Sequence, residues 1–269
     1  MKRTIIAVLL VAASAAFAGC YGGPRHVEPN AFAWSGTVPT GATVHIRNLD
    51  GPIVVDSSGS AAVQIAASAS WRGTRGHLQF AENATSDGIV VCTLYSSDAR
   101  CGVNGYRPSR HGITVWAPFG GRNYARVSYV VRVPRGVQVD VSTVNGELAV
   151  ANVDGAVEAR TVNGSVKIAA RGGAVSAKTV NGSVAAALDS VAGSGAVKLE
   201  TVNGSVTAEL PASLDGSLSI ETVHGRVSSD FPVAATPDDP RHFIGTIGKG
   251  GRTIDLNTVN GSVTLHRGS

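Results

Sequence analysis

The chain has 269 residues, of which 33 are Gly, and only 16% of its residues are charged and 5% aromatic. Helix-favouring Glu, Lys and Met are scarce, which argues against a helical bundle or a coiled coil. A hydrophobic content of 43% is too high for a disordered chain. Residues 20–269 contain 21 Lys and Arg against 19 Asp and Glu, and this near-neutral balance predicts no nucleic-acid partner.

Residues 1–19 have the features of an export signal. Lys2 and Arg3 precede an apolar run at 5–18, which is shorter than the roughly 20 residues of a transmembrane helix. The run ends in Ala16-Phe17-Ala18-Gly19-Cys20, small residues of the kind that a signal peptidase accepts. Cys20 after Ala18-Gly19 also resembles the lipobox of bacterial lipoproteins, although Phe17 replaces the usual Leu. This resemblance implies that Cys20 is acylated and becomes the first mature residue.

The lipid on Cys20 predicts a membrane-anchored protein of the cell envelope, in the outer membrane or periplasm of a Gram-negative source. Tyr21 stands where Asp would signal inner-membrane retention, which favours the outer membrane. Ordinary cleavage after Ala18, giving a secreted protein, is the alternative. Residues 20–40 contain Gly, Pro and Asn and are expected to form a tether.

A repeat organises the second half of the chain, residues 143–267. Thr-Val-Asn-Gly begins at 143, 161, 179, 201 and 258, with Thr-Val-His-Gly at 222. The spacings are 18, 18, 22, 21 and 36, so an insertion at 231–251 is expected to replace one copy. Asn-Gly tolerates positive φ and marks turns. The turn residues are Asn145, Gly146, Asn163, Gly164, Asn181, Gly182, Asn203, Gly204, His224, Gly225, Asn260 and Gly261.

Apolar residues alternate with polar ones before each Thr, as in Val197-x-Leu199-x-Thr201, which indicates strands with one buried face. Recurrence of one tetrapeptide at every second turn favours an all-β fold, a single elongated β-solenoid of stacked repeats of about 18 residues. Equivalent Asn side chains would then form a hydrogen-bonded ladder. An antiparallel hairpin meander is the alternative. In the solenoid, Leu265 belongs to the final coil and is expected to have a neighbour on one side only.

Residues 41–142 form a less regular part of the same domain. The segment at 43–55 has the same strand, turn and strand, and further strands are expected at 62–71, 77–81, 88–95, 112–116 and 125–133. Trp71, Tyr95, Trp116 and Tyr129 are interpreted as core or end-cap aromatics, with a carbohydrate-stacking platform as the alternative.

With lipid on Cys20, Cys92 and Cys101 remain as an even pair in an oxidising compartment. Their separation of nine residues suits a local disulfide, and it does not match the Cys-x-x-Cys spacing of redox or zinc sites.

The whole pattern resembles bacterial β-strand-repeat putative adhesins, a family of unknown function. The resemblance covers roughly residues 40–267 and rests on Asn48-Leu49-Asp50-Gly51, Val133-Pro134-Arg135-Gly136-Val137, the Thr-Val-Asn-Gly array and Ile247-Gly248-Lys249-Gly250-Gly251. It implies an envelope protein and supplies no catalytic residues.

Motifs of enzymes, metal sites and cofactors are missing from the sequence: no Gly-x-Ser-x-Gly, His-Glu-x-x-His or Walker-type loop occurs. We therefore expect no enzyme, no cofactor and no metal. A polar cluster of Asp238, Asp239, Arg241 and His242 is interpreted as a solvated loop, and His224 as a variant of the ladder.

The leading hypothesis is a non-enzymatic envelope lipoprotein whose extended β surface binds a protein or glycan. The alternative is a carbohydrate-active enzyme on a β-helix scaffold, which needs acidic residues that converge on one face. The repeat offers Glu147, Glu158, Glu200, Glu209 and Glu221 at differing offsets. A structural or signalling lipoprotein without an external ligand is a third possibility.

Overall fold

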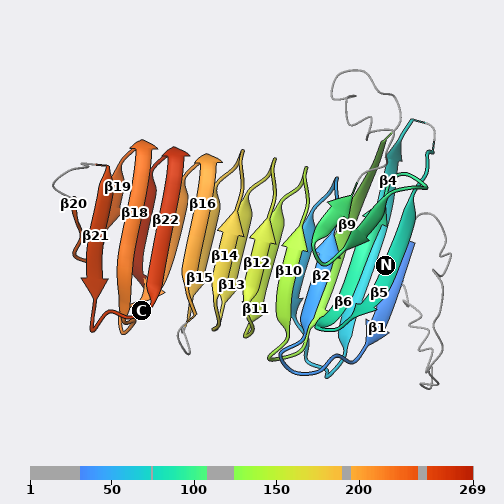
Figure 1. Ribbon diagram of the computed structural model, residues 1–269, viewed down its shortest axis with the longest axis horizontal. Coiled ribbons are helices and arrows are strands. Elements are labelled where there is room, and N and C mark those ends of the chain that lie inside the picture. The colour runs from blue at the N-terminus through green and yellow to red at the C-terminus, as the bar shows by residue number, and fades with distance from the viewer. Residues whose placement is uncertain (1–30, 74, 108–123, 190–194, 236–240, 269) are drawn as a thin grey trace, which may run out of the picture.

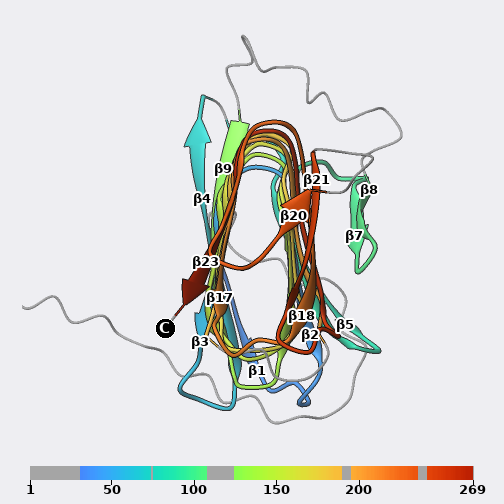
Figure 2. The same cartoon turned by 90° about the vertical axis from the view of Figure 1, so that its left-hand side faces the viewer.

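A computed structural model describes residues 31–73, 75–107, 124–189, 195–235 and 241–268. Two long sheets face each other along one axis and enclose a narrow core (Figures 1 and 2). The fold is the predicted β-solenoid, in which each coil gives one strand to each sheet. The predicted tether at 20–40 is too long, because β1 already begins at Ala31.

Sheet A has ten strands in the spatial order β1 (Ala31–Gly36), β4 (Val63–Arg72), β9 (Tyr124–Val133), β3 (Ile53–Ser57), β11 (Leu148–Val153), β13 (Val166–Ala170), β15 (Val184–Leu188), β17 (Val206–Pro211), β23 (Val263–Gly268) and β19 (Val227–Ser229).

Sheet B has eleven strands in the order β20 (Ala234–Ala235), β21 (His242–Ile247), β18 (Gly216–His224), β22 (Thr253–Asn260), β16 (Val197–Asn203), β14 (Val175–Lys178), β12 (Val157–Arg160), β10 (Gln138–Ser142), β2 (Thr43–Arg47), β6 (Gly88–Leu94) and β5 (Gln79–Thr85). A separate hairpin joins β7 (Arg100–Gly102) to β8 (Gly105–Arg107).

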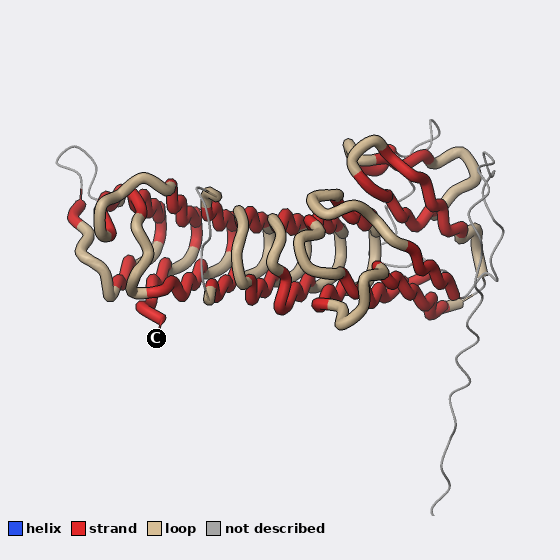
Figure 3. The backbone as a smooth tube through the Cα atoms, turned by 90° about the horizontal axis from the view of Figure 1, so that it is seen from below, coloured by secondary structure: helices blue, strands red, loops and turns tan. Residues whose placement is uncertain are grey.

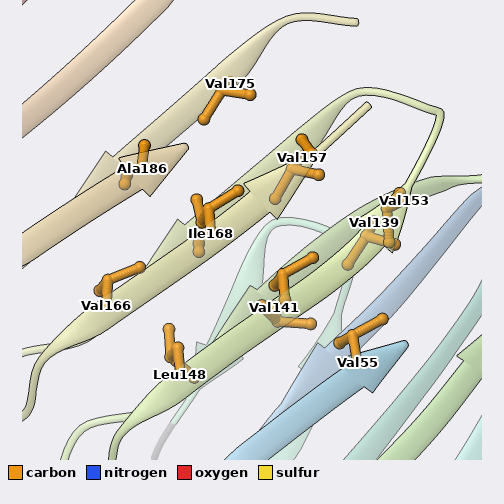
Figure 4. Packing of buried hydrophobic residues seen from close by; sticks show 14 of the residues in the cluster. Val55, Val139, Val141, Leu148, Val153, Val157, Val166, Ile168, Val175 and Ala186 are labelled. Carbon is orange, nitrogen blue, oxygen red and sulfur yellow. The ribbon is translucent and has the colours of Figure 1, made fainter. Parts of the chain in front are cut away.

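The central coils stack in chain order. In sheet B, β10, β12, β14 and β16 pair in parallel, and in sheet A β11, β13, β15 and β17 do the same. Each inward residue therefore meets its own equivalent in the next coil, as Val166 meets Val184. Figure 4 shows these side chains filling the space between the sheets. The alternation found in the sequence is thus the inside–outside alternation of the strands.

The C-terminal coil does not lie at the end of the array, contrary to the prediction. Strand β22 pairs with β16 on one side and with β18 on the other, and β23 lies between β17 and β19. The coil that begins at Thr253 is therefore inserted between two coils that precede it in the chain. Leu265 is fully buried and has a neighbour on both sides.

The predicted insertion at 231–251 does not replace a coil. It contains β20 and β21, which pair antiparallel and cover the outer edge of β18. The chain then crosses back to form β22. The double spacing between Thr222 and Thr258 arises from this edge cover.

The N-terminal end is interleaved in the same way. The coil formed by β2 and β3 lies between β6 and β9 on its outer side and β10 and β11 on its inner side. Antiparallel pairs add β5 to β6, β4 to β9 and β1 to β4. The strand expected at 77–81 is β5 and ends later, at Thr85, whereas the one expected at 112–116 falls outside the described residues.

Candidate binding surface

The outer face of sheet A carries a row of small side chains over the central coils. A shallow groove of about 380 Å³ crosses β3, β11, β13, β15 and β17. Its outward-pointing floor residues are Ala149, Ala151, Ala169, Ala185 and Ala187. Because Ala is short, a partner can approach the sheet closely along this floor.

Larger side chains bound the alanine floor. Val54 and Asp56 of β3 lie at one end of the groove, and Thr207 and Glu209 of β17 lie at the other end. Lys167 of β13 lines the groove between them. Val54 is 43% exposed and its cross-strand neighbour Val130 is 50% exposed, so the apolar strip continues onto β9. Two exposed Val side chains beside an alanine floor form a continuous apolar surface that water covers poorly.

The outer face of sheet B has a different character, because its charges neutralise one another. The Glu200 carboxylate forms ion pairs with Lys178 Nζ at 3.2 Å and with Lys198 Nζ at 3.0 Å. Arg160 forms an ion pair with Glu158. Partial burial opposes ionisation of Glu200, but hydrogen bonds from Lys198 and Lys178 outweigh it, and its pKa is lowered. The two faces therefore offer a partner different chemistry: the central coils of sheet A present mainly small apolar side chains with a few charges around them, and those of sheet B present paired charges.

A buried polar cluster lies on the N-terminal part of sheet B. Arg47 is only 1% exposed and donates to both carboxylate oxygens of Asp140. His45 Nδ1 lies 2.9 Å from Asp140 Oδ2, and His45 Nε2 lies 3.2 Å from Asp87 Oδ2. Burial opposes ionisation of Asp140, but hydrogen bonds from His45 and Arg47 prevail and lower its pKa to about 2. The cluster is a set of mutually neutralised charges, which suits a structural role.

The β7–β8 hairpin covers this cluster. Arg47 donates to the carbonyl of Val103, between the two strands, at 2.6 Å. The disulfide between Cys92 and Cys101, which the sequence predicts, ties the hairpin to β6. The sequence pattern does not predict this cluster, because polar residues that alternate with Val44 and Ile46 would face water in a strand with one buried face. The hairpin shields that outward face, and only the fold places it there.

The predicted turn residues line one edge of the solenoid. The Nδ2 atoms of Asn163, Asn181, Asn203 and Asn260 each donate to the Oδ1 of the preceding ladder member, at 2.8–2.9 Å. The ladder follows the spatial order, so Asn260 comes directly after Asn203, and β18 places His224 beside Asn260.

Glycine is required at these turns by close approach. A Cβ on Gly204 would lie 2.1 Å from the carbonyl oxygen of Gly182, since each turn rests on the backbone of the next. Exposed Val162, Val202 and Val259 stand next to the ladder. The edge thus has a structural explanation that needs no ligand.

The candidate acidic residues do not converge as a catalytic pair. Glu209 lies on the outer face of sheet A, whereas Glu158, Glu200 and Glu221 belong to β12, β16 and β18 of sheet B. Glu147 lies in the turn before β11. Glu158 and Glu200 are also engaged by cations.

The polar cluster of the insertion and one aromatic lie partly outside the described residues. Asp238, Asp239 and Trp116 are not described, and His242 Nε2 lies 3.0 Å from Ser219 Oγ. Tyr129 is buried and shares a hydrogen bond of 2.7 Å with Thr93, and burial raises its pKa. Tyr129 is therefore part of the core, as predicted, and cannot serve as a stacking platform.

Among the described residues, no group of three or more His, Cys, Asp and Glu side chains could hold a metal ion. Over the same ranges the structure contains no helix of the length and hydropathy needed to cross a membrane.

Comparison with known proteins gives a family and a fold. The profile of the family described as Toastrack DUF4097 matches residues 76–266. The solved structure of a putative cell adhesion protein from Clostridium sporogenes ATCC 15579 is 12% identical, with a TM-score of 0.50 over 88% of this chain and 100% of that one. A putative adhesin from Bacteroides fragilis NCTC 9343 is 11% identical, with a TM-score of 0.24 over 89% of this chain and 98% of that one. No curated protein matches the chain.

Proposed function

Because the chain belongs to the Toastrack DUF4097 family, we propose that it is an exported envelope lipoprotein that binds another envelope component and catalyses no reaction. The binding surface is the outer face of sheet A, and the anchor is a lipid on Cys20. The partner is a protein or a glycan of the envelope.

The observation that carries this proposal is the difference between the two outer faces. Sheet B neutralises its charges internally, while sheet A presents an alanine floor with exposed Val54 and Val130. An extended apolar strip with a polar rim has the composition of an interaction surface. The Clostridium structure is described as that of a putative cell adhesion protein, which fits this role.

The Cys92–Cys101 disulfide supports export, since disulfides persist in oxidising compartments. The signal at residues 1–19 and the Cys20 lipobox add the route and the anchor. A carbohydrate-active enzyme is less well supported, because the acidic residues are dispersed over two faces and a turn.

The binding surface is tested with the soluble mature chain, residues 20–269 with Cys20→Ser. Ala185→Arg places a long cation on the floor of the groove, and Ser176→Arg places the same side chain on the outer face of sheet B. We expect capture of an envelope component that binds the parent and the Ser176→Arg protein directly, and at least tenfold weaker binding by Ala185→Arg. Equal binding by all three would reject the sheet A surface.

The anchor is tested separately in the full chain. Labelled fatty acid should enter the wild-type protein and not the Cys20→Ser variant, which should leave the membrane fraction. A wild-type protein without an acyl group would show that the lipobox interpretation is wrong. Turnover of an envelope glycan that is lost on substituting one carboxylate would refute a purely binding role.

A further inference from the structure

The near-neutral total charge conceals a division along the array. Residues 31–137 contain 10 Arg against 5 Asp and Glu, a surplus of five positive charges. Residues 138–269 contain 10 Lys and Arg against 13 Asp and Glu, a deficit of three. Residues 31–107 and 124–137 build the N-terminal end of the solenoid, at the right of Figure 1. Among the residues that the structure describes, this end holds 8 Arg against 5 Asp and Glu, and the rest of the array holds 10 Lys and Arg against 11 Asp and Glu, so the excess of positive charge lies at the N-terminal end.

The basic side chains of this end are exposed on several of its elements. They lie at the end of β4 and in the loop after it, on the β7–β8 hairpin, on the outer face of β9 and in the turn after β9. They are Arg72, Arg75, Arg100, Arg107, Arg126, Arg132 and Arg135.

The β7–β8 hairpin concentrates two of these charges at one point. Arg100 and Arg107 are direct cross-strand partners, and both side chains are exposed. Among the described residues, no ion pair joins either guanidinium to a carboxylate. Like charges directly opposite each other destabilise a hairpin. A phosphate between two guanidinium groups would remove that repulsion and accept their paired hydrogen bonds.

The hairpin is held rigidly enough to present these charges. The Cys92–Cys101 disulfide and the Arg47 hydrogen bond to Val103 fasten it to sheet B. Figure 2 shows β7 and β8 standing off the sheet B side of the array, and Figure 3 shows the array from below with its N-terminal end at the right. A binding surface on a fastened hairpin loses little entropy when a ligand arrives.

The proposed lipid anchor points to the same end. Ten residues separate Cys20 from Ala31, the first residue of β1. A segment of that length spans at most about 35 Å, so a lipid on Cys20 would keep this end of the solenoid close to the bilayer. The rest of the array has no excess of positive charge and would not be attracted by the anionic headgroups that attract the basic end.

We propose that the N-terminal end is a docking surface for anionic phospholipid, with the Arg100–Arg107 pair as its phosphate-binding centre. This proposal rests on the proposed envelope location, but not on the groove of sheet A. The β7–β8 hairpin is fastened to β2 and β6 of sheet B, so docking through it leaves the groove on the outer face of sheet A available to a partner.

The test uses the soluble chain with Cys20→Ser, so that acylation cannot contribute. Binding to vesicles of phosphatidylcholine with 30% phosphatidylglycerol is compared with binding to pure phosphatidylcholine by co-sedimentation. The Arg100→Gln/Arg107→Gln variant should bind the anionic vesicles about 25-fold more weakly, at about 5-fold for each cation removed. The matched control Arg226→Gln/Lys249→Gln, in two exposed turns of the rest of the array, should bind like the parent.

Three outcomes would overturn the proposal. The parent could bind neutral and anionic vesicles equally, or both variants could lose binding equally, which would leave only net charge as the cause. The hairpin variant could also keep vesicle binding and lose retention on heparin, which would make the surface a site for an acidic glycan. Circular dichroism and thermal unfolding must first show that the hairpin variant is folded; if it is not, Arg107→Gln alone serves, with a drop of about 5-fold expected.

The outcome is independent of the acylation experiment. A wild-type protein without lipid but with Arg-dependent vesicle binding would refute the anchor and keep the docking surface. A lipidated protein whose soluble form does not bind anionic vesicles would confirm the anchor and refute the docking surface.

Discussion

The central coils and the two ends of the array share one strand pattern but differ in how chain order relates to spatial order. In the centre, β12, β14 and β16 are neighbours in space because their coils follow one another in the chain. At the C-terminal end, β22 separates β16 from β18, and at the N-terminal end β2 separates β6 from β10. The same repeat therefore permits two kinds of stacking, and local sequence does not choose between them.

The interleaving protects the C-terminal coil of the chain. In a linear repeat array the terminal coil has one neighbour and is the first to open. Here the outer edges are formed by short or antiparallel strands such as β19 and β20–β21, while the terminal coil β22–β23 is held from both sides. Peeling from the C-terminus must break two strand interfaces at once.

Deletion of residues 249–269 gives the largest difference. In a linear array it would remove an end coil and leave the rest folded. In the interleaved array it removes an inner coil whose Ile254, Leu256, Val263 and Leu265 are fully buried. At about 1.5–3 kcal/mol each, these side chains contribute about 6–12 kcal/mol, close to the whole stability of a domain. We expect no cooperative thermal transition in the truncated chain; a melting temperature near that of the parent would argue for linear stacking.

Leu265→Ala and Leu199→Ala compare an interleaved coil with a central one. Both side chains are fully buried between two neighbouring strands, so each substitution should cost about 2–5 kcal/mol. Val227→Ala, on the outermost strand β19, should cost about 1 kcal/mol or less because that side chain is only partly buried. Urea unfolding gives the three values. A small loss at Leu265 would place β23 at the edge.

Asp140→Asn probes the polar cluster, which has no counterpart in the central coils. The pKa of Asp140 is lowered from 3.8 to about 2 in the folded protein, so the ionised carboxylate stabilises the fold above the unfolded pKa. Its contribution of about 2 kcal/mol should be present at pH 7 and be lost as the pH falls from about 4 to about 2. The measurement is unfolding free energy against pH for both proteins. A difference that persists at pH 2 would mean that packing, not charge, is responsible.

The Asn ladder gives the smallest effect. Asn203 donates to Asn181, and Asn260 donates to Asn203, each at the exposed edge. Double-mutant cycles should show coupling of about 0.5–1 kcal/mol for the Asn181–Asn203 pair and for the Asn203–Asn260 pair. The second pair is 57 residues apart in the chain and adjacent only in the interleaved order. Zero coupling there, with normal coupling in the first pair, would contradict that order.

The charge division shows what a whole-chain average conceals. The count of 21 cationic against 19 anionic side chains is correct for residues 20–269, but a total does not show where along the chain the charges lie. Counting the two sections separately would have revealed the basic N-terminal part from the sequence. That Arg100 and Arg107 face each other could not be seen in this way, because the turn at 102–105 sets their register.

The amino-acid sequence is sufficient to predict the solenoid, the inward face of each strand, the turn residues and the Cys92–Cys101 pair. These features depend on periodicity and local spacing. The strand and turn pattern recurs in every repeat, and the Cys pair follows from the separation of its two residues. The positions of β22–β23 and β2–β3 within the array, in contrast, follow from tertiary contacts that the sequence pattern does not specify. Any coil that presents Val, Leu or Ile inward and an Asn-Gly or Asp-Gly turn fits several positions in the array, so the choice depends on the edge strands that cover β18 and β9. The cluster of His45, Arg47 and Asp140 is likewise buried by a hairpin that only the fold brings onto it.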